Sequence, residues 1–95
     1  MARADIRGQW ALVTGASSGL GVDFARILAE YGANLVLAAR RQERLEQVRD
    51  EITQQHGVQV EVISIDLAQA DAPHTLYDDI HARGIEIDIL INNAG

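Results

Sequence analysis

The sequence predicts an α/β fold in which helices cover a doubly wound parallel sheet. Short apolar runs, typical of buried strands, alternate along the chain with longer segments whose apolar residues recur at helical spacing. A glycine-rich turn also lies between the first apolar run and the first helical segment. Because crossovers between parallel strands are right-handed, we expect four strands in the order 3-2-1-4 with three helices.

The predicted strands are short and lie between glycines or polar residues. The first covers residues 9–14, and the second and fourth, at 34–39 and 87–91, are largely apolar runs, as expected of buried strands. The third, at 58–65, begins with an alternation through Gln59 and Glu61. This alternation places the third strand at an edge of the sheet.

Each predicted helix has one apolar face and ends at a glycine. The first helix covers residues 19–31, and its apolar side chains are Leu20, Phe24, Ile27, Leu28 and Tyr31. The second covers 41–56, with the narrow stripe Leu45, Val48 and Ile52. The third follows Asp71 as N-cap, has Pro73 in its first turn, and turns Leu76 and Ile80 toward the sheet.

Composition excludes several classes of protein. The 95 residues allow one domain at most, and a net charge of −6 argues against a nucleic-acid-binding surface. No apolar run is long enough to span a membrane, and the first residues lack a secretory apolar segment, so we expect a cytoplasmic protein. The chain has no cysteine, and its histidines show no ligand spacing, so no metal site is predicted. Because there is no lysine, a Walker A loop is excluded.

The stretch LVTGASSGLG, residues 12–21, is the strongest candidate for a binding site. At a strand-to-helix turn, free backbone N–H groups and the helix dipole both favour a pyrophosphate. We expect Gly15 to allow a sharp turn, Gly19 to allow close approach of phosphates, and Gly21 to allow the helix to pack closely on the sheet. Ser17 and Ser18 offer hydroxyls for capping or for ligand binding. The alternative is a plain turn in which glycines only relieve crowding.

Three motifs resemble those of the short-chain dehydrogenases/reductases. Residues 14–21 match the pattern T-G-x-x-x-G-x-G, NNAG at 92–95 resembles a second signature, and Asp66-Leu67 resembles a third. The resemblance implies a Rossmann-type fold, a single nucleotide-binding portion over residues 1–95, a homo-oligomer, and hydride transfer between a nicotinamide cofactor and a small-molecule carbonyl or alcohol. It implies cofactor contacts for Gly15, Ser17, Ser18, Gly19, Leu20, Gly21, Asp66, Leu67, Asn93, Ala94 and Gly95.

For two of these residues we also weigh a structural role. Asp66 is expected on the adenine side of the cofactor, although it could simply cap the turn that follows it. Asn93 is expected first to tie the fourth strand to the Thr14 end of the first, and second to contact the cofactor.

The end of the second strand favours NADP over NAD. An NAD site usually has an acid there, roughly 20 residues past the glycine turn, which binds the ribose 2′-hydroxyl. Ala39 stands at that point, followed by Arg40 and Arg41, whose guanidinium groups suit a 2′-phosphate. Some NADP-selective relatives have a basic residue where this chain has Ser18. Alternatively, both arginines are solvated and pair with Glu43 or Glu46.

The resemblance does not extend to catalysis. The family uses a serine and a Tyr-x-x-x-Lys pair, whereas here Tyr31 and Tyr77 are followed four residues later by Leu35 and His81. We therefore predict no catalytic residue, an incomplete fold and an inactive chain. The strand at 87–91 would be an exposed apolar edge. A non-catalytic nucleotide-binding or interaction fragment is the alternative, and a methyltransferase explains neither Arg40 nor NNAG.

Overall fold

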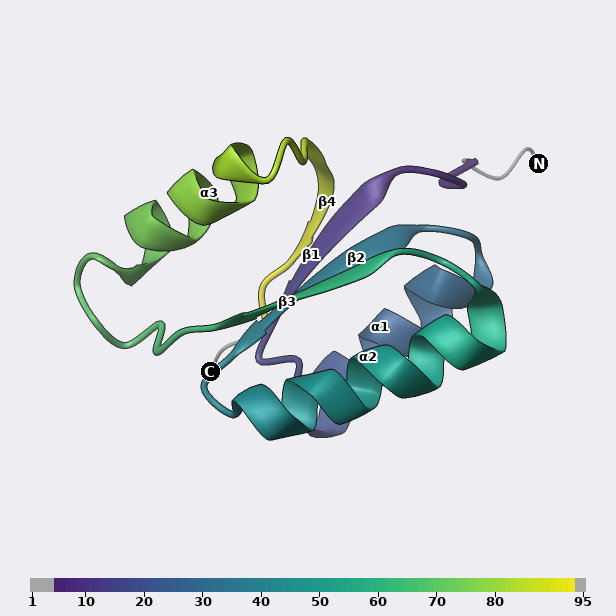
Figure 1. The fold of residues 1–95 in the computed structure, drawn as a ribbon, viewed down its shortest axis with the longest axis horizontal. Helices are drawn as coiled ribbons and strands as arrows, with labels where there is room; N and C mark the ends of the chain where they lie inside the picture. Colours follow the sequence, from purple (N-terminus) through teal and green to yellow (C-terminus); the bar gives the residue numbers. More distant parts are fainter. Residues whose placement is uncertain (1–4, 94–95) are drawn as a thin grey trace.

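In the computed structural model, which describes residues 5–93, strands and helices alternate as predicted (Figure 1). In chain order the elements are β1 (Trp10–Thr14), α1 (Gly19–Glu30), β2 (Asn34–Ala39), α2 (Gln42–His56), β3 (Val60–Ser64), α3 (Ala72–Ala82) and β4 (Ile87–Ile91). The predicted segments therefore differ from the observed ones only at their ends.

Over this range the strands form one parallel sheet in the order β3-β2-β1-β4, which confirms the predicted topology. β1 and β2 are in register from Trp10 opposite Asn34 to Thr14 opposite Ala38. On its other side β1 pairs with β4, and the register shifts between Trp10 and Ala11. The carboxyl ends of the strands meet at one end of the sheet, where a doubly wound fold places its ligand.

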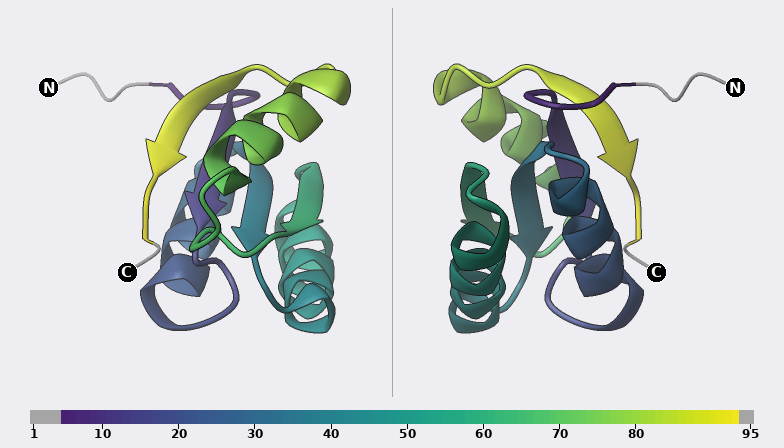
Figure 2. Two further views of the ribbon diagram at one scale, coloured as in Figure 1. Left: turned by 90° about the vertical axis from the view of Figure 1, so that its left-hand side faces the viewer. Right: turned by 90° about the vertical axis from the view of Figure 1, so that its right-hand side faces the viewer.

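Helices lie on both faces of the sheet, with α1 and α2 on one face and α3 on the other (Figure 2). Alternate residues of the central strands therefore enter two different cores. The core beneath α1 and α2 includes Ala11, Val13, Leu35, Leu37, Leu45, Val48 and Ile52. The core beneath α3 includes Leu12, Val36, Ala38, Ile63, Leu76 and Ile80. The apolar residues predicted for α2 and α3 are thus confirmed as buried.

The apolar face predicted for α1 is wrong. Its large apolar side chains are exposed or only partly buried: Leu20 at 63%, Ile27 and Tyr31 at 49%, Phe24 at 37%, with Leu28 partly buried. The buried residues are small, namely Gly21, Val22, Ala25 and Ala29. Small side chains let the helix approach the sheet closely, and the close contact of Gly21 with the preceding turn fixes the rotation of the helix.

α3 begins as predicted but without its predicted side-chain cap. Asp71 is the N-cap residue and a proline lies in the first turn, yet the Asp71 side chain makes no capping hydrogen bond. Side-chain capping needs an extended backbone at the N-cap, whereas Asp71 has φ −90° and ψ −3°. The Asp71 carbonyl instead accepts the N–H of Thr75 at 3.0 Å.

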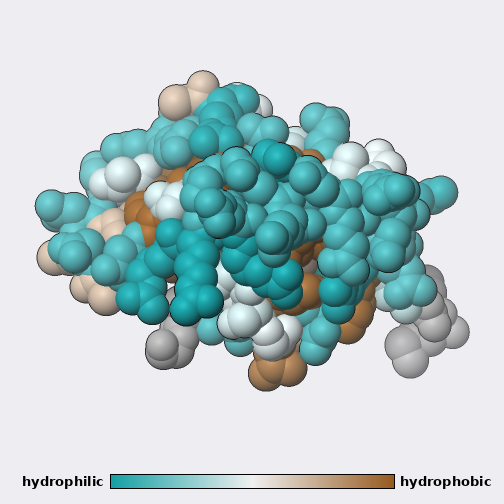
Figure 3. Space-filling model, turned by 60° about the horizontal axis from the view of Figure 1, so that its bottom comes forward, coloured by the Kyte–Doolittle hydropathy of each residue, from teal (hydrophilic) through white to brown (hydrophobic). Residues whose placement is uncertain are grey.

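β4 ends the sheet on the side of β1, and Leu90 on it is 51% exposed. Seen from the side of α1 and α2, the surface is mainly hydrophilic, with hydrophobic patches between the polar side chains (Figure 3). No helix in the described part of the chain is both long and apolar enough to cross a bilayer.

Candidate cofactor-binding site

A crevice of about 470 Å³ opens at the carboxyl ends of the strands. It is lined by Gly15, Ser17, Ser18, Ala39, Arg40, Ile65, Asp66, Leu67, Ala68 and Asn93. The structure thus brings together the glycine turn, the end of β2, the segment after β3 and the segment after β4. Of the predicted site residues, Gly19, Leu20, Gly21 and Arg41 lie outside the crevice lining, and Ala94 and Gly95 lie outside the described residues.

The turn after β1 is held by close backbone contacts. Gly15 has φ +64°, and a Cβ placed on it would come within 2.9 Å of the Asn93 carbonyl oxygen. A Cβ on Gly21 would clash with the Gly15 carbonyl group. Gly21 therefore packs the start of α1 closely against the turn that follows β1. Both positions need glycine because a Cβ would meet backbone atoms of a neighbouring segment.

The start of α1 suits an anion. Ser18 is the N-cap with an extended backbone, but its side chain makes no capping hydrogen bond, and the first turn of α1 contains no acidic residue. The first N–H groups of the helix therefore have no side-chain cap, and the positive end of the helix dipole is not neutralised nearby. Gly19 has φ +56°, and a Cβ placed there would meet no atom within 4 Å, so this side of the turn is open.

Arg40 and Arg41 follow β2 but occupy different surroundings. Arg40 is exposed at the rim of the crevice beside the buried Ala39, and its carbonyl accepts the Ser64 hydroxyl at 2.8 Å. Arg41 is the N-cap of α2 and lines a separate hollow on that helix. Within the described residues, neither guanidinium forms the predicted alternative ion pair with Glu43 or Glu46.

Asp66 both lines the crevice and caps a turn. Its Oδ1 accepts the N–H of Ala68 at 3.0 Å, and its carbonyl accepts the N–H of Gln69 at 3.1 Å. Asp66 therefore caps the turn that follows it, which was the alternative role considered for it, and it also borders the crevice. Leu67 packs against the core beneath α3 and forms the apolar part of the same wall.

Thr14 joins the ends of β1 and β4. The buried Thr14 hydroxyl oxygen accepts the N–H of Asn93 at 3.0 Å, and the hydroxyl lies 3.1 Å from Asn92 Oδ1 and 3.4 Å from the Ile91 carbonyl oxygen. The predicted link between the two strands is therefore present. It is made by the backbone of Asn93 and the side chain of Asn92, not by the Asn93 side chain.

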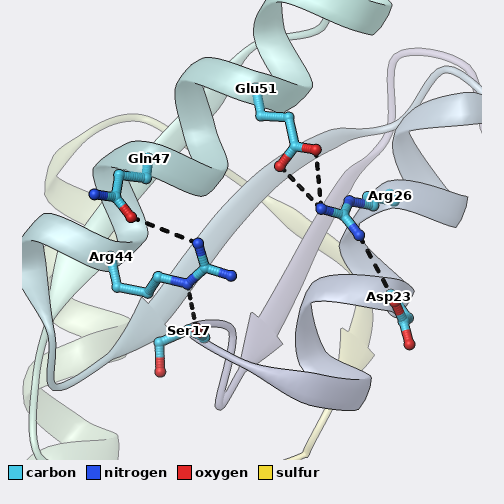
Figure 4. Close-up of polar contacts among 6 residues, drawn as sticks. All are labelled: Ser17, Asp23, Arg26, Arg44, Gln47 and Glu51. Carbon is cyan, nitrogen blue, oxygen red and sulfur yellow. Dashed lines mark hydrogen bonds and ion pairs between the residues drawn. The ribbon is translucent and has the colours of Figure 1, made fainter.

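Two residues that hold the glycine turn were not predicted. Ala16 is fully buried, and its N–H donates to the Ala38 carbonyl at 3.3 Å. One feature of the sequence could have indicated this burial, because Ala16 is an apolar residue next to two serines in the turn. Arg44 of α2 donates Nε–H to the Ser17 carbonyl at 2.9 Å (Figure 4), and no sequence pattern predicts that contact.

A second arginine joins the two helices on this face. Arg26 of α1 donates Nη2–H to both carboxylate oxygens of Glu51 on α2, at 2.9 and 3.0 Å, with Asp23 3.9 Å from Nη1 (Figure 4). The helix that starts at the turn is therefore attached to the helix that supplies Arg44.

The tyrosines lie outside the crevice. Tyr31 caps the carboxyl end of α1, at the opposite end of that helix from the turn, and Tyr77 lies on α3 with 46% of its surface exposed. Over residues 5–93 no group of three or more histidine and carboxylate side chains could hold a metal ion.

Comparisons with known proteins agree with this geometry. A family model described as short chain dehydrogenase matches residues 9–95. The very-long-chain 3-oxoacyl-CoA reductase of Anas platyrhynchos is 43% identical over 90 residues, which cover 93% of this chain and 28% of the relative. The fatty acyl-CoA reductase of Acinetobacter baylyi is 44% identical over 93 residues, which cover 98% of this chain and 31% of the relative.

The same likeness is found among solved structures. L-sorbose reductase from Gluconobacter frateurii, in complex with NADPH and L-sorbose, superposes with a TM-score of 0.89 at 33% identity. The match covers 97% of this chain and 36% of that enzyme. The chain thus spans about three tenths of the length of these curated relatives.

Proposed function

Since the chain belongs to the short-chain dehydrogenase/reductase family, we propose that it forms the NADP(H)-binding part of an oxidoreductase acting on a carbonyl or alcohol substrate. The observation that carries the proposal is the crevice itself, in which the uncapped start of α1 faces the same space as Arg40. The NADPH complex of the sorbose reductase supports the choice of cofactor.

The residues of the crevice fit such a cofactor. The turn at Gly15 to Gly19 would hold the pyrophosphate through backbone N–H groups, helped by the Ser17 and Ser18 hydroxyls, because this part of the chain is open and free of acidic residues. Leu20 and Gly21 continue the same helix start. When bound, the nicotinamide ring gives or accepts the hydride, and the protein's contribution here is to bind and orient.

The other walls would receive the remaining parts of the cofactor. We assign Asp66 and Leu67 to the adenine side and the segment of Asn93, Ala94 and Gly95 to the ribose. These assignments follow what the family resemblance implies for the two motifs, and the position of Asp66, Leu67 and Asn93 in the crevice lining supports them.

We assign the preference for NADP to the end of β2. Ala39 places no negative charge at the crevice, so it would not repel a 2′-phosphate, and the exposed Arg40 can approach such a phosphate from the rim. Arg41, in the neighbouring hollow, adds positive charge nearby. Asp66 is the one acidic residue among the described residues of the lining, and its Oδ1 is engaged by Ala68.

The alternative proposal is a non-catalytic nucleotide-binding or interaction fragment. It is favoured by the exposed side chains of Leu20, Phe24 and Ile27 on α1 and of Leu90 on β4, which further protein could cover. The family's Tyr-x-x-x-Lys pair would have to come from elsewhere, because this sequence contains no lysine. We therefore propose that the 95 residues bind cofactor without turning over substrate. Homo-oligomeric assembly and a cytoplasmic location stay predictions.

Titration of the chain with NADPH and with NADH, followed by calorimetry, tests the proposal. We expect NADPH to bind more tightly than NADH by roughly tenfold or more, the range for a hydrogen bond to a charged group. No hydride transfer to a short aldehyde should be seen. A sample that is folded by circular dichroism and binds neither nucleotide would contradict the cofactor proposal and leave the interaction fragment.

A further inference from the structure

Arg44 reaches from α2 to the glycine turn. Its Nε–H donates to the Ser17 carbonyl oxygen at 2.9 Å, although the two residues are 27 positions apart. Its Nη1 lies 3.5 Å from Oε1 of Gln47, one turn further along α2 (Figure 4). The planar guanidinium group can contact both oxygens because its N–H groups are arranged as a rigid fork.

The contact fixes the peptide group between Ser17 and Ser18. This peptide is trans, so its carbonyl and its N–H point in opposite directions. Holding the Ser17 carbonyl toward α2 therefore turns the Ser18 N–H away from α2. Ser17 and Ser18 both line the crevice, whereas Arg44 does not.

The neighbouring anchors do not restrain this peptide. Ala16 is held through its N–H on the Ala38 carbonyl, and Gly21 is held against Gly15. Between these two points the Ser18 side chain makes no capping hydrogen bond. Arg44 thus supplies a restraint in the middle of the turn.

We infer that Arg44 is a positioning residue for the nucleotide site, which orders the turn so that the Ser18 N–H is directed for binding a phosphate. This inference rests on the proposed cofactor function. Under this inference the two arginines have different roles. Arg40 distinguishes NADPH from NADH, whereas Arg44 supports the binding of both nucleotides, because both carry the same pyrophosphate.

The test compares Arg44→Ala with Arg49→Ala as the matched control. Arg49 lies on the same helix and pairs with its neighbour Asp50 at 3.0 Å, away from the turn. Removal of the Arg44 contact should weaken NADPH and NADH binding by the same factor, about three- to tenfold, the size expected for one hydrogen bond. R49A should bind both nucleotides as the unaltered chain does.

A second measurement needs no nucleotide. In ligand-free R44A, the amides of residues 16–19 should exchange hydrogen faster, and the carbonyl ¹³C resonance of Ser17 should shift, while R49A leaves both unchanged. A general loss of stability would instead accelerate exchange throughout the sheet. Unchanged exchange and an unchanged Ser17 resonance in R44A would overturn the inference.

The two measurements also separate the inference from the proposed function. If the unaltered chain binds neither nucleotide, the proposed function fails, and the amide exchange still decides whether Arg44 orders the turn. A loss of affinity in R44A that is confined to NADPH would overturn the positioning role, because it would make Arg44 a contact of the 2′-phosphate.

Discussion

The backbone N–H of Asn93 donates to the hydroxyl oxygen of Thr14 at 3.0 Å and so joins β4 to β1 beside the crevice. The same hydroxyl lies within hydrogen-bond distance of Asn92 Oδ1, at 3.1 Å. Thr14 is buried, so its loss would leave polar groups of the neighbouring strand poorly satisfied.

Thr14→Val should therefore destabilise the fold although it keeps the shape of the side chain. We expect the free energy of unfolding to fall by about 1–3 kcal/mol, the cost of leaving a buried polar group unpaired. Urea denaturation measures it. Thr53→Val, on the exposed face of α2, is the control and should change stability by less than about 0.5 kcal/mol. Equal effects of the two substitutions would refute the role of the Thr14 hydroxyl.

Gly21→Ala should destabilise the fold, although a glycine-to-alanine change within a helix ordinarily stabilises it. The new Cβ would clash with the Gly15 carbonyl, so either α1 or the turn must move. We expect a loss of about 2 kcal/mol or more in stability, together with weaker nucleotide binding, since overpacking typically costs 1–3 kcal/mol. Gly57→Ala is the control, because a Cβ there meets no atom within 4 Å and only the φ of +69° opposes it. Thermal unfolding that ranks G57A as the less stable variant would speak against a tight contact at Gly21.

The topology of the fold and the members of the crevice could be predicted because their signals are local. Each strand is an apolar run, and parallel strands bring their carboxyl ends together, so Gly15, Arg40, Asp66 and Asn93 had to meet. The rotation of α1 could not be predicted in the same way. Its large and its small apolar residues both recur at helical spacing, and the small ones face the core in the structure, where Gly21 contacts the turn closely.

Contacts between exposed polar residues could not be predicted from the sequence either. Arg44 is one of several arginines on a polar helix, and its bond to the Ser17 carbonyl depends on how α2 packs beside the turn. The side-chain cap expected at Asp71 is absent from the structure, because a residue type favours a cap without fixing the backbone around it. Ser18 has the extended backbone of a cap, yet its side chain makes no capping hydrogen bond.

The corrected face of α1 can be tested by a pair of substitutions. Ile27→Gln alters a side chain that is 49% exposed and should change the free energy of unfolding by less than about 0.5 kcal/mol. Val22→Ala removes two buried methyl groups and should cost about 1–3 kcal/mol. Chemical denaturation of both variants gives the comparison. A larger loss of stability in Ile27→Gln than in Val22→Ala would instead support the apolar face that the helical periodicity predicted.

The acid-sensitive contribution of Asp5 to stability should be small, because Asp5 and Arg7 are both exposed and solvent screens their attraction. A side-chain hydrogen bond from Arg7 lowers the pKa of Asp5 from 3.8 to about 2. A carboxyl whose pKa is depressed by folding stabilises the fold above its unfolded pKa, and this contribution is lost as the pH falls from about 4 to about 2. NMR titration of the Asp5 carboxyl carbon measures the pKa, and Arg7→Gln should raise it toward 3.8 without reaching it, because the backbone N–H of residue 7 still donates to Asp5 Oδ1. An unshifted pKa in the unaltered chain would show that the pair does not form in solution.

Arg40→Ala tests the assignment of cofactor preference. Because Arg40 is exposed at the rim and Ala39 beside it is neutral, the guanidinium is the group that would distinguish a 2′-phosphate from a 2′-hydroxyl. We expect NADPH binding to weaken by about 1.5–3 kcal/mol, the range for hydrogen bonds to charged groups, and NADH binding to stay the same.

A competition experiment can show whether the lost NADPH affinity comes from the 2′-phosphate itself. Adenosine 2′-phosphate should displace NADPH from the unaltered chain at a lower concentration than adenosine does, and this difference should disappear in R40A. Arg49→Ala, which leaves the crevice intact, should behave as the unaltered chain. Equal losses of NADPH and NADH affinity in R40A would place Arg40 among the general contacts of the cofactor, and the preference for NADP would then need another source. Higher salt should narrow the gap between the two nucleotides, because the rim is open to solvent and the attraction between exposed charges is screened.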